Sequence, residues 1–218
     1  MNATTIKKCL DFLDSFNIGE LRTTLKTEYM KATSAEPNKK LTLLTAVKKA
    51  ITNKHEKREA LTTVMHDKNG LQFICDGYIA VIFNAYIAEL EALPQTDSEK
   101  SIDIWRISEG FKAGEENAVT EQERVIIQNI GKYKKIFGKD QKIKLFNHYF
   151  SAEYIKKLID IIGSDFINYK STFTGIYTET ENKTAFICAL RPSAIPEQEQ
   201  NGINEQTEKF YKILTENN

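Results

Sequence analysis

Residues 71–83 read LQFICDGYIAVIF, two apolar runs joined by an Asp-Gly turn. Short apolar runs bounded by turn residues are typical of buried β-strands. A second turn, Asp67-Lys68-Asn69-Gly70, comes just before, and residues 60–66 before it are rich in Thr and Val. Asn-Gly between two such runs is a strong hairpin signal. The sequence therefore predicts a three-stranded meander over residues 60–83.

The segment before the meander is expected to be a helix that begins at Leu41. Its apolar positions share one face at helical spacing: Leu43, Val47, Ala50 and Ile51. Lys48, Lys49 and Lys54 point away from that face. A helix followed by three strands is thus the first predicted unit.

The last third of the chain repeats this order. Residues 142–150 predict a strand, and Ser151 is expected to cap a helix that ends at Gly163. That helix carries Lys156 and Lys157 off its apolar face. Three strand-like runs follow, at residues 166–171, 173–178 and 184–190. Helices and short strands in this order predict an α+β fold.

The predicted core, residues 41–192, has an extension at each end. We expect an N-terminal helical arm over residues 1–40, and an acidic tail over residues 193–218 with one helix around Phe210 and Leu214. Residues 84–140 are an insertion or connector between the two units. Within it we expect a strand over residues 102–107, an exposed acidic loop over residues 109–117, and a helix from a Thr120 cap to Gly138.

The composition bounds the class of protein. With 41% hydrophobic and 10% aromatic residues among 218, the chain has enough apolar surface to fold. It has no leader-like start and no apolar run long enough to span a membrane, so we expect a cytoplasmic protein without membrane contact. The three cysteines, Cys9, Cys75 and Cys188, are too widely spaced for a disulfide framework or a Cys-x-x-Cys metal site.

Charge is distributed in blocks along the chain. Thirty basic and thirty acidic residues cancel, which argues against an obligate nucleic-acid binder of the small basic type. However, residues 39–58 and 132–157 are strongly basic, and residues 88–123 are acidic. Lysines on helices can neutralise phosphates without reading bases, and they can equally form a solvated helix face.

Residues for catalysis form no recognisable pattern. The three histidines are scattered, and no Gly-rich phosphate loop is present. Asp67, Asp76 and Glu89 could be ligands of a two-metal nuclease, which needs clustered carboxylates. Asp67 and Asp76 each precede a turn, where Asp is favoured for backbone hydrogen bonding. We therefore expect no enzyme, cofactor or metal, and keep a diverged metal-dependent hydrolase as the third alternative.

Two stretches resemble the half-domain unit of the DNA sliding clamps, the β subunit of bacterial replicative polymerases. The clamps carry an apolar strand followed by Thr-Asp-Gly, an aromatic residue or His, Arg, Leu and Ala. This chain keeps Asp76-Gly77 and Ala80, with Cys75 in place of Thr and Ile79 in place of Arg. In residues 144–192 the matching residues are Phe146-Asn147, Tyr154-Ile155, Leu158-Ile159 and the run from Ala185 to Pro192.

The resemblance implies a clamp-like domain of two βαβββ-type units, with the two helices side by side facing DNA. It implies a non-catalytic DNA-binding or replication and repair accessory protein, of a kind that a phage or mobile element would encode. Duplex DNA would be bound through its phosphates by five lysines: Lys48, Lys49, Lys54, Lys156 and Lys157. A clamp ring contains several such domains and this chain has one domain's worth, so a homo-oligomer is expected.

A protein-interaction adaptor without DNA contact is the main alternative. Such a module would dock a replication protein or a peptide in the groove between its two units. Its amphipathic N-terminal helices could take part in that contact or in dimerisation. Lys-to-Glu changes distinguish the two functions, because only DNA contact predicts a loss of binding that follows charge.

Overall fold

The structure is a computed structural model that describes residues 37–52, 56–67, 69–96, 102–138, 141–163, 168–172 and 174–216. Its helices are α3 (Pro37–Ile51), α4 (Ile104–Lys112), α5 (Glu121–Gln128), α6 (Ile130–Phe137), α7 (Ala152–Ile162) and α8 (Glu197–Glu216). Its strands are β1 (Met65–His66), β2 (Gln72–Cys75), β3 (Ile79–Phe83), β4 (Glu115–Ala118), β5 (Lys142–Leu145), β6 (His148–Ser151), β7 (Asn168–Thr172), β8 (Gly175–Glu179) and β9 (Lys183–Cys188). Short 3-10 turns cover Glu59–Leu61, Ala88–Ala92 and Pro192–Ala194. The predicted α+β fold is confirmed. Of the arm predicted over residues 1–40, residues 1–36 lie outside the described residues, and residues 37–40 are the first residues of α3, which begins before the expected Leu41.

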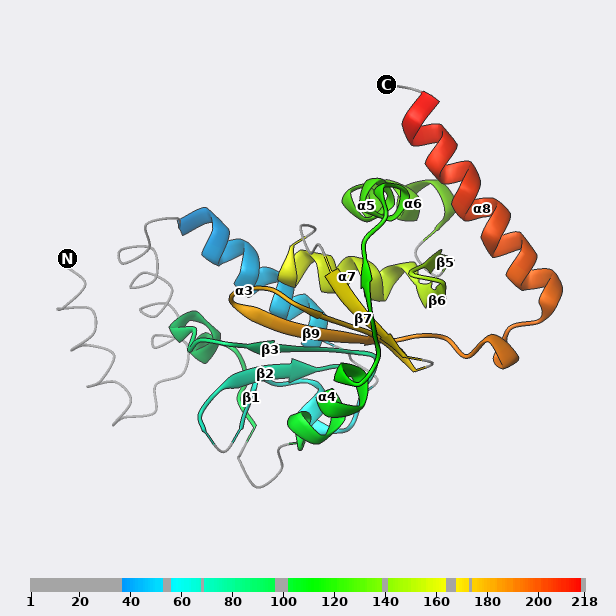
Figure 1. The fold of residues 1–218 in the computed structure, drawn as a ribbon. Helices are drawn as coiled ribbons and strands as arrows, with labels where there is room; N and C mark the ends of the chain where they lie inside the picture. Colours follow the sequence, from blue (N-terminus) through cyan, green and yellow to red (C-terminus); the bar gives the residue numbers. More distant parts are fainter. Residues whose placement is uncertain are drawn as a thin grey trace, which may run out of the picture.

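One antiparallel sheet organises the molecule. Its seven strands follow the order β1-β2-β3-β9-β8-β7-β4. The meander β1-β2-β3 and the meander β7-β8-β9 meet at the central pair β3 and β9, where Val81 lies opposite Ala185. Each meander follows its own helix, α3 or α7, so the predicted repeat of one helix and three strands is present in the structure (Figure 1).

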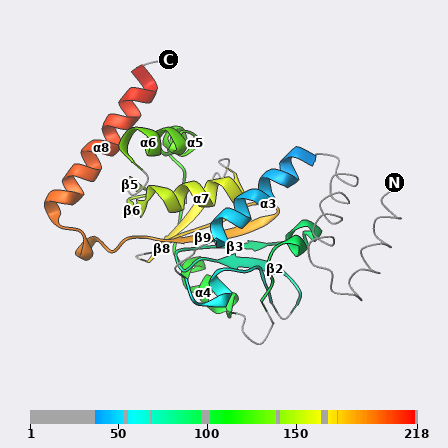
Figure 2. The same cartoon turned by 180° about the vertical axis from the view of Figure 1, so that it is seen from behind.

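Both faces of the sheet are covered. The helices α3 and α7 pack against each other on one face, where Val47 and Leu158 join Val81 in the main core (Figures 1 and 2). The opposite face packs against α4, where Ile104 contacts a second cluster that includes Phe186. Alternation of side chains along each strand separates the two clusters. The sheet is therefore the middle layer of three.

The connector differs from two of its predictions. The strand expected over residues 102–107 is wrong: Ile104 begins α4, and the Asp103 side chain caps this helix by accepting a hydrogen bond from the Arg106 N–H at 3.2 Å. Ile104 and Phe111 are buried at helical spacing, and this spacing outweighs the local preference of the isoleucines for a strand.

The expected acidic loop over residues 109–117 is also wrong. Its first part completes α4, and its second part is the edge strand β4, paired with β7. A Cβ on Gly114 would lie 2.2 Å from the Ser171 carbonyl oxygen, so the glycine allows the two chain segments to approach. Pairing with a strand more than fifty positions away in the sequence made this acidic segment a strand.

The strand expected over residues 142–150 is instead a hairpin, β5 and β6, in a separate two-stranded sheet. Its two turn residues, Phe146 and Asn147, have φ of 55° and 59°. The helix expected from Thr120 to Gly138 begins and ends as predicted, but Asn129 divides it into α5 and α6. The Ser151 cap and the end of α7 at Gly163 are confirmed.

The helix expected around Phe210 and Leu214 is α8, which packs against β5 and α5. Phe210 is fully buried and lies 5.1 Å from Tyr133, ring centroid to ring centroid. A polar helix that buries one apolar stripe is stabilised by that packing. Within the described part of the chain, no helix is long and apolar enough to cross a membrane.

Candidate nucleic-acid interface and an adjacent polar pocket

The two predicted lysines of α3 are exposed. Lys48 and Lys49 lie in its last turn, and no acid among the described residues forms an ion pair with either of them. Cations near a helix C-terminus are favoured by the helix dipole, by about 0.3–1 kcal/mol. Their ammonium groups are therefore available to a ligand in solvent. Lys54 lies outside the described residues.

The two predicted lysines of α7 are engaged within the protein. Lys156 forms an ion pair with Asp160 one turn further along the helix. Lys157 Nζ lies 3.3 Å from Asp76 Oδ2, and the two side chains are only 16% and 9% exposed. The same ammonium group lies 5.1 Å from the centroid of the Tyr154 ring. The structure thus packs α3 against α7. Of the four predicted lysines that it describes, only Lys48 and Lys49 form no ion pair with a described residue.

Asp76 has a structural role in joining the two units. Its Oδ1 accepts the backbone N–H groups of Tyr78 and Ile79 at 3.0 and 2.9 Å, which forms the β2–β3 turn. Beside it, the Tyr78 ring stacks on Tyr154 of α7 at 4.5 Å. This turn of the first unit is therefore fixed on the helix of the second unit by an ion pair and an aromatic contact.

The other carboxylates considered for metal binding do not meet Asp76. Asp67 lies at the opposite end of β2, where its Oδ2 accepts the Trp105 indole N–H at 2.7 Å and its Oδ1 accepts two backbone N–H groups. Glu89 is buried in the 3-10 turn after β3. No group of three or more potential metal ligands is found among the described residues.

Exposed basic side chains that the sequence did not indicate as a site also lie on α6. Lys132 and Lys135 are exposed there, and α6 packs against α7 as α3 does. In Figures 1 and 2, α7 lies between these two helices. The basic block over residues 132–157 was the available signal. It could not distinguish the exposed lysines of α6 from the paired lysines of α7.

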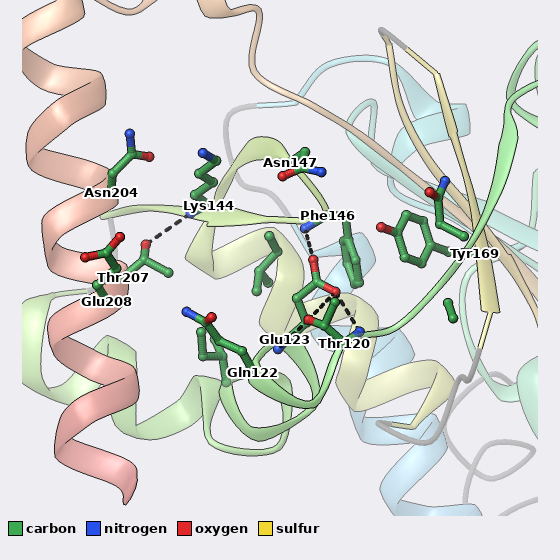
Figure 3. Close-up of a pocket in the computed structure, with 14 residues that line it drawn as sticks. Thr120, Gln122, Glu123, Lys144, Phe146, Asn147, Tyr169, Asn204, Thr207 and Glu208 are labelled. Atoms are coloured by element: carbon green, nitrogen blue, oxygen red, sulfur yellow. Dashed lines mark hydrogen bonds between the residues drawn. The ribbon is translucent and has the colours of Figure 1, made fainter. Parts of the chain in front are cut away.

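A polar pocket that the sequence did not predict lies between α5 and α8. Its volume is about 470 Å³, and it is lined by α5, the β5–β6 turn, the paired strands β4 and β7, and α8 (Figure 3). The backbone N–H of Lys144 donates to Thr207 Oγ1 at 3.2 Å, which fixes β5 to α8. Segments from residue 117 to residue 208 contribute to the lining, so only the tertiary structure assembles this site.

The β5–β6 turn is the strained wall of the pocket. A positive φ is unusual for any residue with a Cβ and rare for an aromatic one. Phe146 adopts it because its ring is buried, with its centroid 4.4 Å from that of Tyr169. Its backbone N–H also donates to Glu123 Oε1 at 2.7 Å. Tertiary contacts therefore hold a conformation that the local sequence disfavours.

Glu123 links this turn to the start of α5. Its Oε2 accepts the backbone N–H and the hydroxyl of Thr120, at 2.9 and 2.8 Å, while Thr120 Oγ1 accepts the Glu123 N–H (Figure 3). This is a capping box. The Glu123 carboxylate thus accepts hydrogen bonds both from the cap of a helix and from a hairpin turn.

Tyr169 supplies a neutral hydroxyl to the pocket. The residue is 7% exposed, and burial together with the charge of Glu123 raises its pKa to about 12. The phenol is therefore protonated at neutral pH. No described residue forms a hydrogen bond with its hydroxyl, which leaves this group free to bind a ligand.

Comparison with known proteins finds no family model that matches the chain, and no curated protein or solved structure that is similar to it. The resemblance to sliding clamps therefore stays a prediction from the residues quoted above.

Proposed function

We propose that this chain is a non-catalytic DNA-binding protein, a replication or repair accessory factor with a clamp-like repeat of one helix and three strands. The observation that carries the proposal is the exposed pair Lys48 and Lys49 at the end of α3, without an acidic partner among the described residues. Such lysines attract phosphates irrespective of base sequence, through release of counterions. Lys132 and Lys135 on α6 would extend the same contact.

The ion pairs of α7 narrow the proposed interface. Binding DNA through Lys156 or Lys157 would require breaking a contact with Asp160 or Asp76. A lysine that stays in such an ion pair does not neutralise a phosphate, and so it releases no counterion from the DNA. We therefore assign the phosphate contacts to α3 and α6, and a packing role to the two lysines of α7.

Fluorescence anisotropy with a labelled duplex tests the proposal. The double variant Lys48→Glu/Lys49→Glu should bind at least tenfold more weakly at low salt, and its plot of log affinity against log salt should be less steep by about 2, one per lost phosphate contact. Lys209→Glu/Lys212→Glu is the matched control, because it makes the same charge change on exposed positions of α8. Absence of duplex binding by the unaltered chain at low salt would refute the proposal.

Light scattering tests the clamp-like part separately. A ring of several copies should have a correspondingly large solution mass and should be retained better on circular than on linear duplex DNA. If the protein is a monomer that binds linear and circular DNA equally, the proposed DNA contact is supported and the proposed ring is refuted.

A protein-interaction adaptor remains the second candidate, and one observation favours it. A groove of about 910 Å³ beside α4 is lined by Ile107, which is 40% exposed, and by Phe111. Glu115 of β4, which is exposed, also lines this groove and gives it a negative charge. This negative charge would favour a partner protein that presents an apolar segment with basic side chains. The variant Ile107→Asp should abolish binding of that partner without changing DNA binding.

A further inference from the structure

We propose that the polar pocket binds a neutral, polyhydroxylated small molecule of the saccharide class. The pocket is formed by α5, the β5–β6 turn, β4, β7 and α8 (Figure 3). The site is separate from the lysines of α3, and the inference does not rest on DNA binding.

The pocket has the size of a small-molecule site. Its volume of about 470 Å³ falls within the range of about 300–1,000 Å³ that is usual for such sites. It is hollowed between elements that are fixed to one another by hydrogen bonds, from Phe146 to Glu123 and from Lys144 to Thr207. A ligand would therefore meet a largely formed cavity.

Amide side chains dominate the polar lining and come from four different elements: Asn117, Gln122, Asn147 and Asn204. An amide offers donors and an acceptor together, which matches a hydroxyl group that also does both. Asn117 Nδ2 donates to the Glu115 carbonyl and to Ser171, which leaves its oxygen for a ligand. Asn204 Oδ1 accepts the Tyr149 hydroxyl at 3.3 Å, which leaves its NH₂ group.

The charges of the pocket favour a neutral ligand over an anion. Lys144 contributes one positive charge to the lining, and Glu208 and Glu123 contribute two negative charges. The Glu123 carboxylate is already occupied by three hydrogen bonds from Thr120 and Phe146. A phosphate or carboxylate ligand would be attracted by the one ammonium group and repelled by the two carboxylates.

Tyr169 and Asn147 are the groups best placed to recognise a hydroxyl. The Tyr169 phenol is protonated and has no hydrogen-bond partner among the described residues, so it can donate to a ligand oxygen. Asn147 is held at the rim by the strained turn, and its exposed amide makes no hydrogen bond within the described structure. Strain that positions a side chain at a cavity is typical of binding sites.

Saturation-transfer NMR tests the assignment with neutral probes, namely maltose, sucrose, N-acetylglucosamine and myo-inositol, and with glucose 6-phosphate as the anionic probe. We expect transfer to at least one neutral probe, and weaker binding of the phosphate. Tyr169→Phe removes only the free hydroxyl and should weaken the binding by about tenfold. Asn147→Gly should weaken it as well, without unfolding the protein, because glycine readily adopts a φ near 59°.

Tyr211→Phe on α8 is the matched control, because it removes a tyrosine hydroxyl outside the pocket and should leave binding unchanged. The inference is overturned by any of three results: no transfer to the neutral probes, unchanged binding in both pocket variants, or tighter binding of glucose 6-phosphate. Circular dichroism of each variant establishes that it is folded. None of these measurements involves DNA.

Discussion

Backbone strain at the single residue Asn147 has a measurable cost. Its φ of 59° is the left-handed conformation, in which a Cβ costs about 1–2 kcal/mol, with Asn among the residues that tolerate it best. Asn147→Gly should therefore raise the free energy of unfolding, by up to about 1 kcal/mol, and Asn147→Ala should lower it by about 1 kcal/mol. Urea denaturation measures both. Equal losses in the two variants would show that the amide, and not the backbone, stabilises the turn.

His148, the next residue, makes stability depend on pH. Burial lowers its pKa in the folded protein, so in mildly acidic solution the unfolded chain binds a proton that the folded chain does not. The stability linked to His148 is fully present above the ordinary histidine pKa of about 6.5. It is lost as the pH falls through the lowered value.

The variant His148→Gln should reduce that loss. Urea midpoints measured above and below the histidine pKa should differ less in this variant than in the unaltered chain. His66→Gln is the control, because it removes a histidine at a different site, 3.3 Å from Glu91. An unchanged difference in His148→Gln would refute the assignment.

At the scale of elements, the capping box of α5 also supports the hairpin. Thr120→Ala should cost about 1 kcal/mol, as for an ordinary cap. Glu123→Ala should cost more, about 2–4 kcal/mol, because it also leaves the Phe146 N–H without its charged acceptor. Chemical denaturation measures both losses.

The cap of α7 provides the comparison. The Ser151 side chain accepts only the Glu153 N–H, at 3.3 Å, so Ser151→Ala should resemble Thr120→Ala. If Glu123→Ala costs no more than these two, then the hydrogen bond between α5 and the turn contributes little to stability.

At the scale of the whole molecule, one sheet shared by both units predicts a single cooperative transition. Leu158 of α7 is buried in the main core, whereas Trp105, the only tryptophan, lies on α4 against the other face of the sheet. Leu158→Ala should cost about 2–5 kcal/mol. It should move the Trp105 fluorescence transition and the far-ultraviolet circular dichroism transition equally.

Ile136→Ala provides the control for that experiment. Ile136 is 50% exposed on α6, so its truncation should change the free energy of unfolding by less than about 0.5 kcal/mol. A Trp105 transition that stays in place in Leu158→Ala would show that the two faces unfold independently.

Local chemistry allowed much of the fold to be predicted. The strands β2, β3, β8 and β9 are short apolar runs between turn residues, and Thr120 and Ser151 are caps whose side chains act within one turn. Such signals depend on near neighbours, so the sequence shows them directly. The repeat of a helix and three strands follows from these signals and was expected on that ground.

Long-range contacts decided the rest. Pairing with β7 made an acidic segment into β4, burial of Phe146 turned one expected strand into a hairpin, and packing against the sheet made residues 104–112 a helix. The same holds for the sites. The sequence determined that lysines lie on α3 and α7, but only the fold brought Asp76 to Lys157 and assembled the pocket, because these contacts join residues far apart in the chain.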